Sequence, residues 1–240
     1  MTPALLAALQ EARAAKRPVA LATHLADGAQ RLLPDPAAPA ALNEAALKAL
    51  DADQSGTVTI DGAAWFLHAY TPPLRLIVVG AVHIAQALVP FASEVGFAVT
   101  VVDPRRSFAS DERFPNVTVR TDWPDEAMHA LAPDGRTAVV TLTHDPKLDD
   151  PALDRALRSE AFYIGALGSR RTHAARLGRL AALGHSETVL ARIKGPVGLN
   201  LEAVTAPEIG LSIAAELVAA RRGSPLAPAN ARGRPAAHAA

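Results

Sequence analysis

From Leu74 onward, short apolar runs alternate with longer amphipathic stretches, and this alternation constrains the fold more than any other feature of the sequence. The apolar runs are rich in Val, Ile and Leu, which is typical of parallel strands covered on both faces. The pattern predicts an α/β fold with a Rossmann-like, doubly wound parallel sheet. The predicted strands are Arg75–Val79, Ala98–Val102, Val117–Arg120, Thr137–Leu142, Ala161–Ile164 and Val189–Ile193. The predicted helices are His83–Glu94, Asp125–Leu131, Pro151–Arg158, Arg171–Leu183 and Pro207–Arg221.

The residues before Leu74 predict a small N-terminal α+β module, residues 1–73. Its last part is a hairpin, Thr57–Ile60 and Ala64–Tyr70, because Asp61-Gly62 supplies the positive φ angles of a two-residue turn. The boundary falls at Thr71-Pro72-Pro73, the Rossmann-like domain at residues 74–222, and a disordered tail at residues 223–240. The other predicted elements of the module are a helix at Pro3–Lys16, a strand at Pro18–Leu25, a connector at Pro34–Pro39 and a helix at Ala41–Leu50.

Charge and cysteine content exclude several function classes. Basic and acidic residues number 24 each, so no global field attracts nucleic acid or an anionic membrane. The absence of cysteine excludes disulfides, zinc–thiolate sites and iron–sulfur clusters in this chain. No metal site is predicted. Met1–Lys16 lacks the apolar core of a signal peptide, and no window reaches the ~18 apolar residues of a membrane span, which predicts a cytoplasmic protein.

Ligands of open parallel sheets bind beyond the carboxyl ends of the strands, so the residues that follow each strand are the candidates. After the first strand, Gly80 provides a tight turn and His83 opens a helix whose amides favour an anion. Val82 stands where a dinucleotide site needs glycine, which disfavours ordinary NAD(P) binding. The alternative is that His83 is a polar first-turn residue with no ligand.

The segments after the second and fourth strands are also polar. Asp103 lies ~20 residues past the first turn, where such folds contact a ribose hydroxyl. The adjacent Arg105 and Arg106 are either a solvated pair or a bidentate phosphate clamp. His144 and Asp145 follow a buried strand, where polar side chains are costly unless exposed or ligand-bound. Capping of the next helix explains Asp145 but not His144.

The segment after the fifth strand, Gly165–Arg171, is the strongest local signal. Gly168 and Ser169, followed by Arg170 and Arg171 at a helix start, present amides, a hydroxyl and guanidinium groups suited to phosphate. A capped turn with solvated arginines is the alternative. Further on, the glycine loop Lys194–Asn200 either closes over a ligand or is a plain connector.

One further motif resembles a calcium loop. Asp51–Gly62 copies the spacing of that loop but has Gly62 where the bidentate Glu belongs, so no useful calcium site is predicted.

Taken in order, five of these motifs resemble the C-terminal domain of the XdhC/CoxI family, maturation factors for xanthine dehydrogenase, carbon monoxide dehydrogenase and related molybdenum hydroxylases. The resemblance covers residues ~74–222. It implies ligand contacts for Gly80, His83, Asp103, His144, Asp145, Gly168, Ser169 and Arg170. The motifs are Gly80–Ala85, Val101–Arg105, Thr143–Asp150, Tyr163–Arg171 and Gly195–Leu199.

The resemblance implies a chaperone without turnover that binds the molybdenum cofactor (molybdopterin, or its cytosine dinucleotide), protects it and delivers it to an apo molybdenum hydroxylase. Further partners would be a cofactor sulfurase or nucleotidyltransferase, and a second copy of the chain in a homodimer. Two alternatives stay open: an NAD(P)-dependent oxidoreductase, and a Rossmann scaffold that bridges a sulfurase and its client without binding cofactor.

The sequence departs from the family pattern in two places. The usual N-terminal domain with a cysteine-containing glycine-rich segment is not found, and residues 1–73 look like a shortened replacement. Gly198–Ala203 reads Gly-Leu-Asn-Leu-Glu-Ala where many members have Gly-Leu-Asp-Ile-Gly-Ala. The apolar strand residues Trp65, Phe66 and Leu67 are either core or a dimer or client surface.

Overall fold

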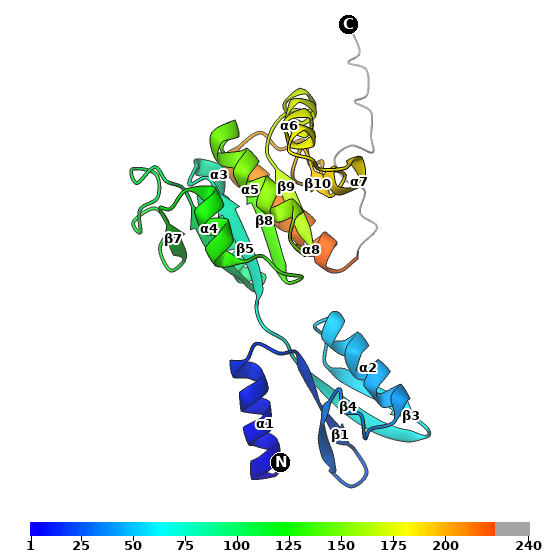
Figure 1. The fold of residues 1–240 in the computed structure, drawn as a ribbon. Helices are drawn as coiled ribbons and strands as arrows, with labels where there is room; N and C mark the ends of the chain where they lie inside the picture. Colours follow the sequence, from blue (N-terminus) through cyan, green and yellow to red (C-terminus); the bar gives the residue numbers. More distant parts are fainter. Residues whose placement is uncertain (224–240) are drawn as a thin grey trace, which may run out of the picture. The chain divides into compact units, whose positions relative to one another are not determined.

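The structure is a computed structural model that describes residues 1–223. The chain divides into two compact units, Met1–Pro72 and a second unit that begins at Pro73 (Figure 1). Apart from Gly223, the tail predicted at residues 223–240 lies outside the described residues. No helix in the described part of the chain is both long and apolar enough to cross a membrane.

The N-terminal unit is a four-stranded antiparallel sheet with two helices, in the sheet order β2-β1-β4-β3. Residues of α2 such as Leu42 and Ala46 pack on Leu33 and Leu67 of the sheet, and all four are fully or almost fully buried. The elements are α1 (Pro3–Ala14), β1 (Val19–His24), β2 (Gln30–Leu33), α2 (Ala40–Asp51), β3 (Gly56–Ile60) and β4 (Ala63–Tyr70).

The predicted hairpin is confirmed, since Ile60 pairs with Ala63 across the turn at Asp61-Gly62. The strand β2 was not predicted, because its four residues begin with two polar ones and show no alternation. Only its antiparallel pairing with β1 defines it as a strand. Of the apolar run on β4, Leu67 is buried core, whereas Phe66 is 38% exposed.

The second unit confirms the predicted Rossmann-like fold. Its six strands are all parallel, in the order β10-β9-β8-β5-β6-β7. The strands are β5 (Leu74–Val79), β6 (Phe97–Val102), β7 (Thr118–Arg120), β8 (Thr137–Thr141), β9 (Tyr163–Ala166) and β10 (Ile193–Lys194). The helices are α3 (His83–Glu94), α4 (Pro124–Leu131), α5 (Pro146–Leu157), α6 (Arg170–Ala182), α7 (Glu187–Leu190) and α8 (Ala206–Arg221).

Helices cover both faces of this sheet (Figure 1). Leu76 and Val78 of β5 pack in a core with α3 and α8, while Ile77 and Val79 of the same strand pack in a second core with α4, α5 and α6. Both faces of β5 are therefore buried, which explains why the strand reads as an uninterrupted apolar run.

In the parallel-sheet unit, three predicted elements have boundaries that differ from the structure by two residues or more. Helix α5 begins at Pro146, not Pro151, because Asp145 caps it and proline is well tolerated at the first helical position. The strand predicted at Ala161–Ile164 runs from Tyr163 to Ala166. The strand predicted at Val189–Ile193 is wrong for its first residues, since Ser186 caps the short helix α7 and only Ile193–Lys194 pairs with β9.

Candidate ligand site at the carboxyl edge of the parallel sheet

The order of the strands reverses between β5 and β8. From β5 the chain continues to β6 and β7 on one side, and from β8 to β9 and β10 on the other. This is the point at which open α/β sheets bind ligands, beyond the carboxyl ends of the strands. The segments after β5, β6, β8 and β9 carry all ten predicted residues: Gly80, His83, Asp103, Arg105, His144, Asp145, Gly168, Ser169, Arg170 and Arg171. The topology therefore brings them to one edge of the sheet.

The turn after β5 is packed tightly against the segment after β8. Gly80 has φ +111°, and a Cβ placed on it would lie 2.6 Å from Cγ2 of Thr143. Arg113, from the segment between β6 and β7, donates a hydrogen bond to the Ala81 carbonyl oxygen over 3.0 Å. Close packing thus requires glycine at position 80, and no ligand fits between Gly80 and Thr143.

The first turn of α3 remains open beyond this packed turn. Val82, at the N-cap position, provides no side-chain hydrogen bond, and His83 is exposed. The first amides of a helix carry partial positive charge and lack partners within the helix, so this end favours an anion.

Asp103 is fully buried and its carboxylate is saturated by protein donors. Its two oxygens accept hydrogen bonds from the Ala81 amide over 2.9 Å and from the Arg105 amide, Nε and Nη2 over 2.7–3.0 Å. Burial would raise the pKa of Asp103, but the hydrogen bonds from Arg105 and Ala81 bring it below its ordinary value. The Arg105 guanidinium also lies 4.5 Å from the ring centroid of Phe108. Asp103 and Arg105 therefore neutralise each other, and a ribose contact for Asp103 stays a prediction.

His144 is exposed and has the left-handed backbone angle φ +62°. Its Nδ1 lies 3.6 Å from the position that a Cβ on Gly168 would occupy, so the segments after β8 and β9 meet at this ring. Asp145 caps α5 by accepting the Lys147 amide over 2.9 Å. The capping alternative thus accounts for Asp145, and His144 lies in a turn closed by a hydrogen bond from the Asp145 amide to Thr143 Oγ1 over 3.0 Å.

The segment after β9 differs from its predicted form. Gly165 lies within β9, so only Gly168, with φ +137°, belongs to the turn. Ser169 caps its own helix, since its Oγ accepts the Thr172 amide over 3.2 Å. Arg170 and Arg171 are exposed. One of the first amides of α6, that of Thr172, therefore has a partner in the protein. The exposed guanidinium groups of Arg170 and Arg171 remain available to an anion.

Sequence reasoning missed a buried polar pair beneath these segments. The side chains of Asp149 on α5 and Arg176 on α6 are each 2% exposed, and Arg176 Nη2 lies 3.6 Å from Asp149 Oδ2, too far for a hydrogen bond. Thr143 Oγ1 donates to Asp149 Oδ1 over 2.6 Å, and Arg176 Nη2 donates to the Leu167 carbonyl over 2.8 Å. Burial raises the pKa of Asp149, and the hydrogen bond from Thr143 and the charge of Arg176 only partly oppose this.

On β8, α5 and α6, five buried side-chain atoms have no hydrogen-bond partner within residues 1–223. They are Thr141 Oγ1, Asp149 Oδ2, His173 Nδ1, Arg176 Nε and Arg176 Nη1. Each unsatisfied buried group costs about 1–3 kcal/mol. A signal existed in the sequence: Asp149 falls on the face of α5 that also buries Ala152 and Leu153, where a charged residue is unexpected.

The glycine loop after β10 is anchored rather than free. Glu216 on α8, only 6% exposed, accepts hydrogen bonds from the Gly198 amide over 2.6 Å and from the Tyr163 hydroxyl over 2.5 Å. Burial and the Glu216 charge raise the pKa of Tyr163 well above its ordinary value, so the phenol stays a donor. The loop is therefore held against α8.

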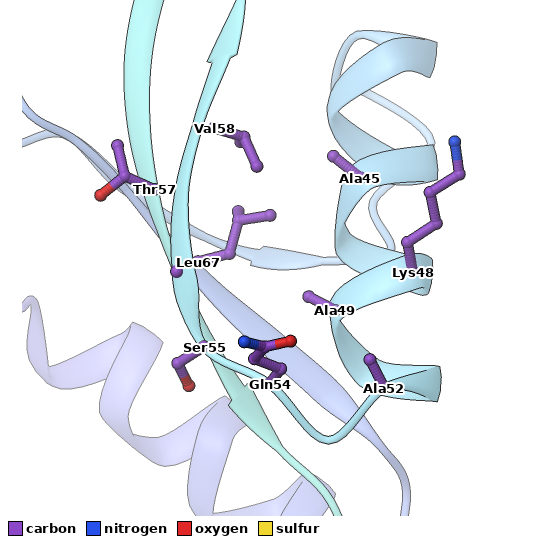
Figure 2. A pocket seen from close by; sticks show the side chains of 10 residues that line it. Ala45, Lys48, Ala49, Ala52, Gln54, Ser55, Thr57, Val58 and Leu67 are labelled. Carbon is purple, nitrogen blue, oxygen red and sulfur yellow. The ribbon is translucent and has the colours of Figure 1, made fainter. Parts of the chain in front are cut away.

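Each unit has a pocket lined by described residues. One of about 360 Å³ lies between α6 and the glycine loop, lined by Arg170, His173, Ala174, Leu177 and Gly195. The other, of about 380 Å³, lies in the N-terminal unit between α2 and the strands β3 and β4 (Figure 2). The lining of the second pocket is mainly apolar, with Lys48, Gln54, Ser55 and Thr57 as its polar side chains, and it contains no predicted site residue.

Comparison with known proteins identifies the parallel-sheet unit. The family model for the XdhC Rossmann domain matches residues 76–217. The chain is 33% identical over 152 residues to the molybdenum cofactor insertion chaperone PaoD of Escherichia coli, covering 63% of this chain and 42% of that protein. It is 29% identical over 158 residues to a probable xanthine dehydrogenase subunit from Bacillus subtilis, covering 65% and 46%. The chain thus spans less than half the length of these two relatives.

A solved structure is similar over more of the chain. The crystal structure of a xanthine dehydrogenase from Bacillus halodurans matches with a TM-score of 0.68 at 25% identity, covering 91% of this chain and 64% of that chain. That coverage exceeds the parallel-sheet unit, so the similarity includes residues of the N-terminal unit. Those residues are the ones that the sequence alone had suggested to be a shortened replacement.

Proposed function

The chain belongs to the XdhC family, and from that premise we propose that it binds the molybdenum cofactor and passes it to an apo molybdenum hydroxylase. One observation carries this proposal. The first turn of α3, which has no side-chain cap, and the exposed His144, which has a left-handed backbone, follow the two strands between which the strand order reverses. In this role the chain is an accessory factor without turnover. A homodimer, and contacts with a sulfurase or nucleotidyltransferase, belong to the same proposal.

The residues present fit such a ligand in charge and in hydrogen bonding. The cofactor carries a phosphate, and the amides that open α3 favour an anion. Arg170 and Arg171 add two exposed guanidinium groups at the start of α6. His83, His144 and the arginines would hold the ligand from the surface, while Gly80 and Asp103 would act by fixing the turn beneath it.

The alternative of an NAD(P)-dependent oxidoreductase is less well supported. Val82 keeps its side chain at the N-cap position, where close approach of a pyrophosphate needs glycine. Asp103, which would contact the ribose, is saturated by Arg105 and the Ala81 amide. NAD(H) titrated against the chain in a calorimeter distinguishes the two functions, since binding at micromolar concentration would favour the oxidoreductase.

Cofactor retention tests the proposal directly. The full chain is mixed with molybdenum cofactor released from a purified molybdenum hydroxylase, and pterin fluorescence after oxidation is measured in the protein fraction from gel filtration. We expect coelution, and we expect Arg170→Ala to weaken retention about ten- to a hundredfold by removing a charge-assisted contact.

The matched control is Arg179→Ala, which removes the same charge from the other end of α6, where Arg179 pairs with Asp150. Retention should be unchanged in this variant. A wild-type chain that carries no pterin after gel filtration would contradict the proposal. An equal loss of retained pterin in Arg170→Ala and Arg179→Ala would show that retention depends on the overall charge and not on a contact with Arg170.

A further inference from the structure

The pocket of about 380 Å³ in the N-terminal unit is a groove between helix α2 and the edge strand β3 (Figure 2). The helix lines it with the small side chains of Ala45, Ala49 and Ala52, and Val58 and Leu67 line the side of the strands. In Figure 2, Ala45 and Ala49 face Val58 and Leu67 across the open space. The volume lies within the range of about 300–1,000 Å³ that is usual for ligand pockets.

The backbone of β3 has a free edge beside this groove. Within residues 1–223, β3 pairs only with β4, and it is the last strand of its sheet. The turn between them has two residues, so the residues that flank the turn exchange backbone hydrogen bonds, and the pattern alternates along the strands. The Ala64 carbonyl accepts from the Leu25 amide, which agrees with this pattern because Ala64 then faces β1 and its neighbours face β3. The amides and carbonyls of Thr57 and Thr59 therefore point away from the sheet.

The two edges of this sheet differ in how they are protected. Proteins usually protect an exposed strand edge with a charge, a proline, a bulge or a covering helix. The strand β2 follows this rule, since it carries Arg31 and its Leu32 packs against α1. The strand β3 reads Gly-Thr-Val-Thr-Ile, without charge or proline, and pairs with β4 in unbroken register. An unprotected edge beside an apolar groove is the arrangement to which extended peptides add as a further strand.

Charge around the groove favours an acidic occupant over a second copy of this chain. Lys48 is the charged side chain among the residues that line the groove. Its ion pair with Glu44 over 2.8 Å is exposed, so the pair is weak and an acidic group of an occupant can compete for Lys48. Asp53 precedes β3 and Asp61 follows it, so antiparallel pairing of two β3 strands would bring like charges toward each other.

We propose that β3 and α2 form a docking site for an extended segment of a partner protein, which pairs with Thr57 and Thr59 as a fifth strand of the N-terminal sheet. Every second side chain of this segment is apolar and lies in the groove beside Val58. An acidic side chain of the segment pairs with Lys48. The site lies outside the parallel-sheet unit and contains no predicted site residue, so this inference does not depend on the proposed function.

The test is an array of synthetic octapeptides probed with the fluorescently labelled full chain. The peptides have Ala, Val or Leu at alternate positions and Glu, Gln or Lys at one position between them, and each has a counterpart with a central proline, which cannot pair as a strand. We expect peptides with Glu to bind about tenfold more tightly than their proline counterparts in fluorescence anisotropy. Equal binding of all peptides and their proline counterparts, including no binding of either, would overturn the inference.

Variants of the full chain test the edge and the groove separately. Thr59→Pro removes an outward-facing amide, a change that an edge strand tolerates, and should weaken the best peptide about tenfold. Thr59→Val keeps the amide and should bind like the wild type. Ala49→Leu fills the groove and should also weaken binding about tenfold, whereas Ala41→Leu, at an exposed position of the same helix, should not.

Amide hydrogen exchange of the wild-type chain covers the case in which a variant does not fold. The amides of Thr57 and Thr59 should exchange more slowly when the best peptide is present at saturation. Unchanged exchange would overturn the inference. Weaker binding by Ala49→Leu but not by Thr59→Pro would also overturn it, because the groove would then take an apolar ligand without strand pairing. So would a smaller mass of Thr59→Pro than of the wild type in gel filtration, because the edge would then pair with a second copy of the chain.

Discussion

The two halves of the parallel sheet satisfy their polar groups in opposite ways at the carboxyl edge. In the half formed by β5, α3 and β6, the buried carboxylate of Asp103 is saturated, and the amides that open α3 lack a side-chain cap. In the half formed by β8, α5, β9 and α6, Asp145 and Ser169 cap the helices, while Asp149 and Arg176 remain unsatisfied inside. The first half therefore leaves helix amides without a side-chain cap, and the second leaves buried side-chain atoms without hydrogen-bond partners.

Thr143 joins the two halves. Its methyl group fills the space beside Gly80, and its hydroxyl donates to Asp149. A substitution at Gly80 would therefore affect Asp149 through the side chain of Thr143. The contrast between the two halves can be tested at the contact between Gly80 and Thr143.

The largest expected effect is that of Gly80→Ala. The new Cβ would lie 2.6 Å from Thr143 Cγ2 on a backbone with φ +111°, so we expect a loss of about 2–4 kcal/mol in the free energy of unfolding. Denaturation in urea measures it. Thr143→Ser removes the opposing methyl but keeps the hydroxyl, and should recover part of the loss, with a coupling energy of about 0.5–3 kcal/mol.

The control for backbone strain alone is Gly96→Ala. Gly96 has φ +94° with nothing within 4 Å of the added Cβ, so its cost should be only about 1 kcal/mol. An equal loss of unfolding free energy in Gly80→Ala and Gly96→Ala, or no coupling energy between Gly80 and Thr143, would contradict the role of Thr143 as the contact between the two halves.

The second prediction uses the opposite pKa shifts of the two buried aspartates. The pKa of Asp103 is lowered in the folded chain, so its stabilisation is present above the unfolded pKa of about 3.9 and is lost as pH falls through the folded pKa. The pKa of Asp149 is raised, so stability is lost as pH rises from the unfolded pKa through the folded one.

Asp103→Asn should therefore be most destabilising above about pH 4 and lose its effect in more acid solution. Asp149→Asn should gain stability relative to the wild type as pH rises from about 4. Urea denaturation of the three chains between about pH 3 and 7 measures both slopes. Parallel pH profiles for the two variants would contradict the contrast.

The sequence predicted the sheet and the edge that carries the site, because both follow from local patterns. Uninterrupted apolar runs indicate parallel strands, and a turn residue such as Gly80 marks the carboxyl end of one. The order of the strands then brings together residues from four separate segments. The strand β2 was missed because its pairing with β1, and not its own pattern, defines it.

The partners of the site residues could not be predicted, since they depend on distances between segments. Asp103 was predicted to face a ligand, and its pairing with Arg105 becomes visible only in three dimensions. Ser169 was predicted to bind phosphate, and the structure adds that its hydroxyl accepts the Thr172 amide and so caps α6. Arg176 shows no motif at all. Its burial beside Asp149 is a feature that a single sequence does not reveal.

The smallest expected effect on stability, with a clear effect on function, is at His144. Its φ of +62° is unfavourable for a side chain that bears a Cβ, and glycine removes this strain at the cost of a more flexible unfolded chain. His144→Gly should therefore unfold within about 0.5 kcal/mol of the wild type, and His144→Ala, which keeps the strain, should be about 1 kcal/mol less stable than His144→Gly.

Cofactor retention should not follow the order of stability of the two variants. Both variants lack the imidazole that meets the segment after β9, so both should retain cofactor about tenfold less well, although one is as stable as the wild type. That result would assign the left-handed backbone of His144 to ligand binding and not to the stability of the fold. If His144→Gly instead unfolds well below the wild type, the ring is part of the packing between the two segments, and the open surface of the site reduces to the first turn of α3 and the arginines of α6.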